Sequence, residues 1–267
     1  MRQTANIAPK RFTMVEITQK ANMLPPITLE EMAGIKLMNR TDTKFVATIE
    51  QLNAFLLAVQ GHYYIQEKNN ERLACYHTTY FDTDDYKMYR MHHCGKQKRE
   101  KIRVRTYMDT NDTFLEVKNK NNHGRTKKKR IIVEGVDTLQ AESDNVTPFL
   151  ATHAWYTLED ISPVIENWFN RITLVNFAKT ERLTIDFNLR FHHLKTDKRD
   201  QLSRVAILEL KRDGNVPSPA LEIFRRLRIK QSGFSKYCIG SALTHPGLKR
   251  NNFKERLIMI HKMENKQ

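Results

Sequence analysis

The sequence predicts an α+β fold in which a closed antiparallel sheet carries its helices on the outside. Three observations indicate this arrangement. Charged side chains recur on one face of at least four predicted strands, apolar side chains occupy the opposite face, and several amphipathic helices are available to cover the apolar faces. Because successive side chains of a strand point to opposite faces, closing the sheet would turn the charged faces inward.

Two capping boxes mark the first helices. Thr28 and Thr48 are followed three residues later by Glu31 and Gln51, which is the spacing of this motif, so helices are expected to begin there. Further helices are expected at residues 84–93, 147–155, 163–170, 220–228, 234–244 and 252–263. Stretches rich in β-branched or alternating residues predict strands at residues 38–48, 73–81, 98–108, 113–120, 127–133, 172–178, 182–190 and 204–211.

Length and composition limit the class of protein. The chain has 267 residues, of which 40% are hydrophobic, so it can bury a core, and this excludes wholesale disorder. We expect a poorly ordered segment at residues 1–25 and a single domain at 26–267. The longest plain apolar run, residues 55–59, is too short for a membrane span. Three widely spaced cysteines without a CxxC motif favour reduced thiols and a cytoplasmic location.

The charge distribution points to an anionic partner. The formal net charge is +15, and residues 96–130 alone hold 13 Lys and Arg against 4 Asp and Glu. This basic stretch runs through predicted strands. Arg99, Lys101, Arg103 and Arg105 share one strand face, from which Arg103 and Arg105 can approach the same phosphate. An ordinary antiparallel sheet would leave such a face in solvent.

In a closed sheet the charged faces would instead line the interior. Ionised groups removed from water cost several kcal/mol each unless they are compensated. An interior with this many cations therefore requires water and an anionic ligand.

Nine short motifs follow one another over some 200 positions. They are Arg40-x-Asp42-x-Lys44, Thr79-Tyr80-Phe81-Asp82-Thr83, Tyr89 with His92, His93 and Gly95, Lys101-x-Arg103-x-Arg105, Phe114-Leu115-Glu116-Val117-Lys118, Lys127 to Arg130, Arg182-Leu183-Thr184-Ile185-Asp186, Leu208-Glu209-Leu210-Lys211, and Phe234-Ser235-Lys236-Tyr237. Singly each motif is weak, but in this order they resemble the VTC-domain proteins, which are the polyphosphate polymerase branch of the triphosphate tunnel metalloenzymes (CYTH-like proteins).

The resemblance implies an eight-stranded antiparallel tunnel barrel with helices packed outside. It implies a triphosphate held by basic residues and Mn²⁺ or Mg²⁺ held by Glu209, with Glu116 as a weaker candidate. We assign the catalytic role to Lys44, Arg103, Arg105, Lys118 and Lys236, and substrate binding to Arg40, Lys101, Lys127, Lys129, Arg182 and Lys211.

The chain departs from the family pattern in one place. The family usually carries an arginine on the strand before Arg182, where this sequence reads Asn176-Phe177-Ala178-Lys179, and Lys179 is the candidate replacement. Lysine lacks the planar fork of arginine.

Three functions fit these residues. The first is transfer of the γ-phosphate of ATP to a growing polyphosphate chain, with no specific nucleic acid as partner. The second is a metal-dependent triphosphatase, in which Glu116 or Asp42 would activate water. The third is a module that binds polyphosphate or RNA without turnover.

Overall fold

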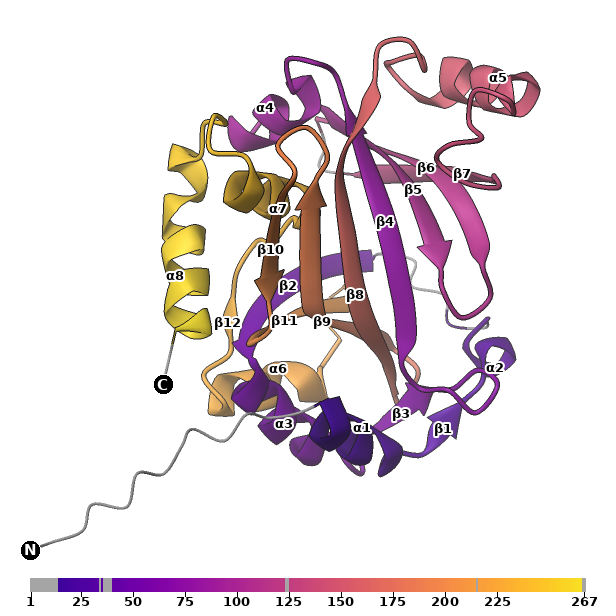
Figure 1. Ribbon diagram of the computed structural model, residues 1–267. Coiled ribbons are helices and arrows are strands. Elements are labelled where there is room, and N and C mark those ends of the chain that lie inside the picture. The colour runs from indigo at the N-terminus through magenta and orange to yellow at the C-terminus, as the bar shows by residue number, and fades with distance from the viewer. Residues whose placement is uncertain (1–13, 34, 36–39, 123–124, 215, 266–267) are drawn as a thin grey trace, which may run out of the picture.

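The computed structural model describes residues 14–33, 35, 40–122, 125–214 and 216–265, with only the backbone of Arg40. In this part of the chain, one curved sheet is surrounded by helices (Figure 1). The strands are β1 (Pro26–Ile27), β2 (Arg40–Thr48), β3 (Tyr63–Gln66), β4 (Ala74–Asp82), β5 (Arg99–Tyr107), β6 (Asp112–Lys120), β7 (Thr126–Ile132), β8 (Ser162–Asn176), β9 (Glu181–His193), β10 (Lys198–Leu202), β11 (Val205–Asp213) and β12 (Lys230–Gln231). The helices are α1 (Met14–Asn22), α2 (Leu29–Ala33), α3 (Ile49–Ala58), α4 (Lys87–His93), α5 (Ser143–His153), α6 (Pro219–Arg226), α7 (Lys236–Thr244) and α8 (Lys254–Glu264), with a 3₁₀ turn at Asn251–Phe253.

The α+β class is confirmed, but the sheet is not a closed barrel. Its order is β12-β2-β11-β9-β8-β4-β5-β6-β7, and among the described residues no pairing joins β7 back to β2. Eight long strands thus curve around one concave face and leave a gap between the first and the last. The free edge, β7, is exposed and rich in lysine, a composition that discourages further strand pairing.

The helix expected at residues 163–170 is wrong. These residues form the first half of β8, which continues to Asn176 and pairs with β4 on one side and β9 on the other. Val164, Ile165 and Trp168 are residue types that favour strands. A short apolar segment can fit both periodicities, so pairing on two sides decides its structure.

Part of the segment expected to be poorly ordered is helical. Residues 1–13 lie outside the described residues, whereas α1 begins at Met14 and buries Ile17 and Ala21. Both capping boxes are confirmed, since Glu31 and Gln51 each exchange hydrogen bonds with the preceding threonine. The predicted strand at 38–48 is described from Arg40 onward.

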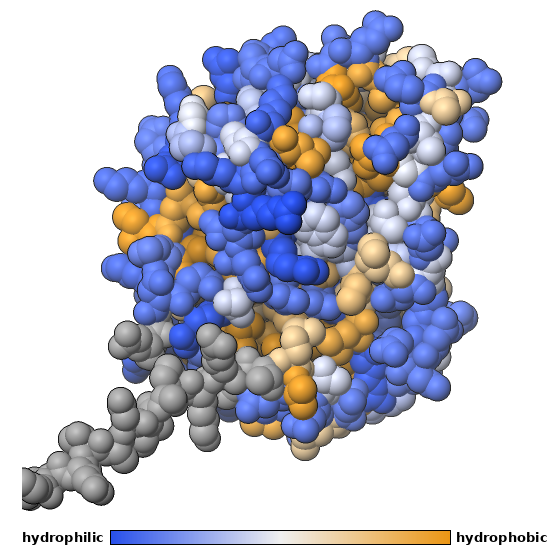
Figure 2. Space-filling view, in the orientation of Figure 1, coloured by the Kyte–Doolittle hydropathy of each residue, from blue (hydrophilic) through white to orange (hydrophobic). Residues whose placement is uncertain are grey.

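Two hydrophobic clusters hold the sheet in its curved shape. One lies on the convex side, where α1, α3 and α6 cover the outer faces of β2, β11, β9 and β8 (Figure 1). The other packs α4, α5, α7 and α8 against the sheet: α4 contacts β4 and β5, α5 contacts β7, α7 contacts β8 and β9, and α8 contacts β11. Hydrophilic side chains cover most of the face seen in Figure 2. No helix in the described part combines the length and hydropathy that a membrane span needs.

Asp82 fixes the position of α7 relative to the sheet. This fully buried carboxylate at the end of β4 accepts hydrogen bonds from the backbone of Met88 and Tyr89, at 2.9 and 2.8 Å, and from the Tyr237 hydroxyl. It therefore ties α4 and α7 to one strand end. Since Tyr237 follows Lys236, the same contact places Lys236 over the concave face.

The tight packing of α7 gives a first prediction. A Cβ at Gly240 would lie 2.4 Å from Phe191 Cδ1 and 2.9 Å from Ile165 Cδ1, whereas a Cβ at Gly135 would meet nothing nearer than 3.9 Å. Gly240→Ala is expected to lower the free energy of unfolding by about 1–3 kcal/mol through overpacking. Gly135→Ala, the matched control, should change it by about 0.5 kcal/mol or less. Urea denaturation measures both, and equal stability of the two variants would contradict the packing described.

Candidate functional site

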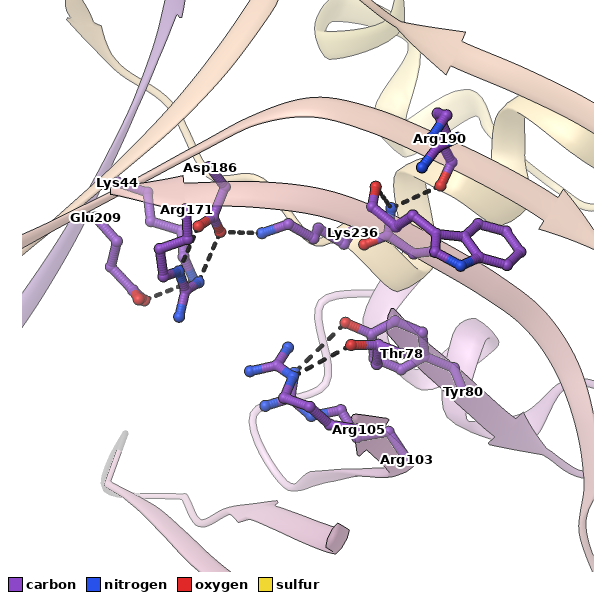
Figure 3. Close-up of polar contacts among 12 residues, drawn as sticks. Lys44, Thr78, Tyr80, Arg103, Arg105, Arg171, Asp186, Arg190, Glu209 and Lys236 are labelled. Atoms are coloured by element: carbon purple, nitrogen blue, oxygen red, sulfur yellow. Dashed lines mark hydrogen bonds and ion pairs between the residues drawn. The ribbon is translucent and has the colours of Figure 1, made fainter. Parts of the chain in front are cut away.

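Charged side chains from both ends of the strand order meet over the concave face. Cross-strand register puts Lys44 opposite Glu209 in β2 and β11, and Arg103 opposite Glu116 in β5 and β6. In Figure 3, Lys44, Glu209, Arg171, Asp186 and Lys236 extend from one wall, and Arg103 and Arg105 extend from the other. The expectation that charged strand faces line one interior space is therefore correct, although the sheet stays open.

Asp186 is the centre of the first charge cluster. Arg171 of β8 donates two hydrogen bonds to its carboxylate, at 2.5 and 2.7 Å, and Lys236 of α7 donates another. Burial alone would raise the pKa of Asp186, but Arg171 and Lys236 hold it well below its usual range. The carboxylate therefore remains ionised and fixes both cations in place.

Glu116 is the centre of the second cluster and is completely buried. Its Oε2 accepts from Arg103 Nε and Nη2, at 2.7 and 2.5 Å, and its other oxygen pairs with Lys128 of β7. Although burial opposes ionisation, Arg103, Arg105 and Lys128 lower the pKa of Glu116. Removing one partner of such a pair leaves an uncompensated charge.

Glu209 forms the third cluster and is the most accessible of the three carboxylates. Its two oxygens lie 3.1 Å from Lys44 Nζ and 3.1 Å from Lys211 Nζ, and a fifth of its side chain remains exposed. Burial raises the pKa of Glu209, but Lys211 and Lys44 outweigh it and lower the pKa. In all three clusters one carboxylate is shared by two cations.

Arg105 and Lys118 have no carboxylate partner among the described residues. Arg105 donates to the Thr78 hydroxyl at 3.2 Å and lies over the Tyr76 ring at 5.4 Å. Burial and Arg103 lower the pKa of Arg105 to about 10. Arg103, burial and Arg105 lower the pKa of Lys118 to about 6. Arg105 therefore carries positive charge that no carboxylate of the described chain pairs with, and Lys118 adds to it only when it takes up a proton.

The remaining predicted residues are distributed over both faces. Lys211 and Arg182 lie opposite each other on the concave face, where Lys101 donates to Ser235 at 3.0 Å. The side chain of Arg40 lies outside the described residues. Lys127 and Lys129 pair with Asn119 and Val117, so they project from the convex face.

The prediction that Lys127 and Lys129 of β7 face the charged interior is therefore wrong. Lys128 and Arg130 stand opposite Lys118 and Glu116 and point over the cavity in place of Lys127 and Lys129. In a run of four basic residues the sequence alone does not fix which alternate pair faces inward. The pairing of β7 with β6 does.

Sequence reasoning missed Arg171, the arginine on the strand before Arg182. Lys179 is exposed in the turn between β8 and β9, with a positive φ of 55°. Because residues 163–170 are predicted as a helix, the predicted strand begins at residue 172 and leaves out Arg171. Only the full length of β8 brings Arg171 opposite Asp186, four residues from Arg182.

The carboxylates fit a divalent ion that shares its coordination with phosphate. No group of three or more His, Cys, Asp or Glu in the described chain could enclose a metal alone. Mg²⁺ commonly binds one or two carboxylates together with substrate phosphates and water. Glu209 is accessible enough for this role, whereas Glu116 is fully buried and both of its oxygens are already engaged in ion pairs.

The VTC domain profile matches residues 39–245, which is more than three quarters of the chain. The chain belongs to the VTC-domain family. No curated protein matches this VTC-domain sequence. Among solved structures, a Hippeastrum protein provisionally assigned as an adenylyl cyclase, with a dominant triphosphatase activity, is similar at a TM-score of 0.50 and 11% identity. That match covers 78% of this chain and 97% of the other.

Two further structures are similar at lower scores. A protein from Pyrococcus horikoshii OT3 has a TM-score of 0.44 and 13% identity, covering 76% of this chain and 98% of the other. A protein from Vibrio parahaemolyticus, provisionally assigned as an adenylate cyclase, has a TM-score of 0.42 and 12% identity, covering 76% and 99%.

The contrast between Arg103 and Arg105 yields a prediction. Arg105→Ala removes a cation without leaving a carboxylate unpaired. The free energy of tripolyphosphate binding should therefore become less favourable by about 1.5–3 kcal/mol, while the free energy of unfolding changes little. Arg103→Ala leaves buried Glu116 with Lys128 alone and should also lower the free energy of unfolding by about 3–5 kcal/mol. Calorimetric titration and urea denaturation separate the two effects. Unchanged tripolyphosphate affinity in a folded Arg105→Ala protein would contradict the cavity position of Arg105.

The low pKa of Lys118 predicts proton uptake on binding. With a pKa of about 6 the free amine is mostly neutral at pH 7.5, and a bound anion raises that pKa. Affinity for tripolyphosphate should therefore increase as the pH falls from 8 to 6 and level off below 6. Calorimetry in two buffers of different ionisation enthalpy measures the uptake. The ligand's own protonation is subtracted by comparison with Lys118→Gln, and equal uptake in both proteins would rule out Lys118 as the source.

Proposed function

We propose that this VTC-domain protein is a polyphosphate polymerase that transfers the γ-phosphate of ATP to a growing polyphosphate chain. The observation that carries the proposal is the charge arrangement of the cavity. Three carboxylates are each shared by two cations, Arg105 adds positive charge without a carboxylate partner in the described chain, and Lys118 adds more when it becomes protonated. A linear polyanion would neutralise this excess.

Phosphoryl transfer depends mainly on positioning and charge stabilisation. A terminal phosphate oxygen of the polymer would attack the γ-phosphorus, the bond from that phosphorus to the bridging oxygen would break, and the electron pair would leave with ADP. Arg105, Lys118 and Lys236 would hold the transferred group and its neighbours. Lys44, Lys211 and Arg182 extend the same face along β2, β11 and β9, where they would hold further phosphates.

The state of the carboxylates favours a polymerase over a hydrolase. A general base works best when its pKa lies near the working pH. The neighbouring cations lower the pKa of Glu116, Asp186 and Glu209, which makes all three weak bases. A phosphate oxygen is already anionic and needs no base, whereas water does.

A triphosphatase is the second candidate. Asp42 lies opposite Lys211 in β2, on the same face as Lys44, and could orient a water molecule there. Glu116, the other candidate for activating water, is fully buried, and its two oxygens bind Arg103 and Lys128. A module that binds polyphosphate or RNA without turnover would use the same cations and release no ADP.

We assign the divalent ion, Mn²⁺ or Mg²⁺, to Glu209. When bound, the ion would neutralise charge on phosphate oxygens as the bond to ADP breaks. Glu116 is the weaker alternative because it is fully buried. We also propose a cytoplasmic location, which the free thiols of Cys75, Cys94 and Cys238 support.

Incubation with ATP and Mn²⁺ tests the function. Long polyphosphate with release of ADP is the result expected for a polymerase. Orthophosphate without polymer would instead identify a hydrolase, and Asp42→Asn should then abolish its release. Binding of polyphosphate with no ADP would support the module without turnover. Affinity of such a module should fall steeply with salt.

Glu209→Gln should separate turnover from binding. The change keeps the size of the side chain and removes its charge, so ATP affinity measured without metal should stay equal or increase. Polymer formation with excess Mn²⁺ should fall by about two orders of magnitude or more, as expected when electrostatic support for the transition state is lost. Glu50→Gln is the control, because Glu50 pairs with Arg204 at 2.9 Å outside the cavity. Polymer formation by Glu209→Gln at the wild-type rate would move the metal assignment to Glu116.

A further inference from the structure

At one end of the cavity the cations give way to aromatic rings. Along the concave face of β5, Arg103 and Arg105 are followed by Tyr107, and Tyr76 ends the same face of β4 opposite it. On β6 the face changes from Lys118 and Glu116 to Phe114. Four neighbouring strands thus end in Tyr76, Tyr107, Phe114 and Ile132, and Ile132 is 76% exposed.

These rings form the wall of a cavity of about 320 Å³. Tyr107 lies 4.9 Å from Tyr76 and 5.8 Å from Phe114, measured between ring centroids, and Tyr76 stacks on Phe169 at 5.0 Å. The volume is near the lower limit of pockets that hold small organic ligands. Three aromatic rings in the wall offer stacking contacts that inorganic phosphate cannot make.

The lining of the pocket carries charges of both signs. At its inner end Arg171 lies over Tyr76 at 5.0 Å and also binds Asp186, so it belongs to both the pocket and the phosphate cavity. Arg130 lies over Phe114 at 4.3 Å. The outer rim carries the carboxylates of Glu71, Asp109 and Asp112, with Lys68 and Arg72 also in the lining.

Arg72 does not offset the carboxylates of the rim. Its guanidinium is bound to Glu67 at 2.7 Å and to backbone oxygens at the end of α1. Asp109 accepts from the Cys75 backbone at 3.2 Å and Asp112 from the Thr110 hydroxyl at 2.5 Å, so both acids are held at the rim.

We propose that this aromatic mouth is a nucleoside-binding subsite, which holds the base and ribose of ATP while the triphosphate lies in the cationic cavity. The subsite rests on the proposed function, because it requires the phosphates to reach Arg171. Purine faces stack on Tyr107 and Phe114, and the rim carboxylates accept hydrogen bonds from ribose hydroxyls or an exocyclic amine. Inorganic polyphosphate gains neither contact.

Comparison of ATP with tripolyphosphate tests the subsite. Both ligands are titrated in EDTA, so that no turnover consumes them. Tyr107→Leu keeps apolar bulk but removes the stacking ring, so ATP affinity should fall about 5- to 50-fold while tripolyphosphate affinity stays within about twofold. Tyr156→Leu is the control, because Tyr156 packs on the same hydrophobic cluster but does not line the pocket. Equal losses for both ligands, or no loss for ATP, would overturn the subsite.

A second variant remains informative if Tyr107→Leu does not fold. Asp112 is exposed at the start of β6, so Asp112→Asn should leave the fold intact. It should raise affinity for tripolyphosphate and leave that for ATP equal or lower, and an equal gain for both ligands would contradict the subsite. The proposed function is tested separately by polymer formation from ATP and Mn²⁺, and it can fail while ATP still binds at the subsite.

Discussion

Compensation of buried positive charge is the constraint on which the rest of this structure depends. The concave face brings together more cations than carboxylates, and each of Asp186, Glu116 and Glu209 is shared by two basic side chains. Such clusters are stable only when the geometry is good and the charges are paired. The same pairing fixes the cations in advance, so little reorganisation is needed when an anion arrives. In the proposed function, Arg105, and Lys118 once it is protonated, would supply the attraction for a phosphate chain, because neither has a carboxylate partner in the described chain.

The apolar parts of the fold serve this charge arrangement. On the convex side, α1, α3 and α6 cover the sheet and leave the concave side free for ionised groups. On the concave side, α7 brings Lys236 to Asp186 and is itself held by the contact of Tyr237 with Asp82. The open edge at β7 leaves Lys128 attached to the sheet on one side only, through β6.

Much of the fold followed from local sequence, and the failures have physical causes. Capping boxes located α2 and α3, and alternation placed Lys44, Arg103, Arg105 and Glu209 on the charged face. Where alternation was ambiguous the prediction failed: in residues 127–130 either pair could face inward, and in residues 163–170 a buried strand was taken for a helix. Closure of the sheet and the Arg171–Asp186 pair depend on long-range register, which local patterns do not encode.

The most direct test of this account is a crystal structure with a nonhydrolysable ATP analogue and Mn²⁺. The account predicts phosphate oxygens within hydrogen-bond distance of Arg105 and Lys118, with the three carboxylate clusters still paired to Arg171, Arg103 and Lys211. Electron density for the phosphates on the convex face, near Lys127 and Lys129, would contradict it. So would phosphates that bind only after Asp186 and Glu116 have released their cations, because the cavity would then not be organised in advance for its ligand.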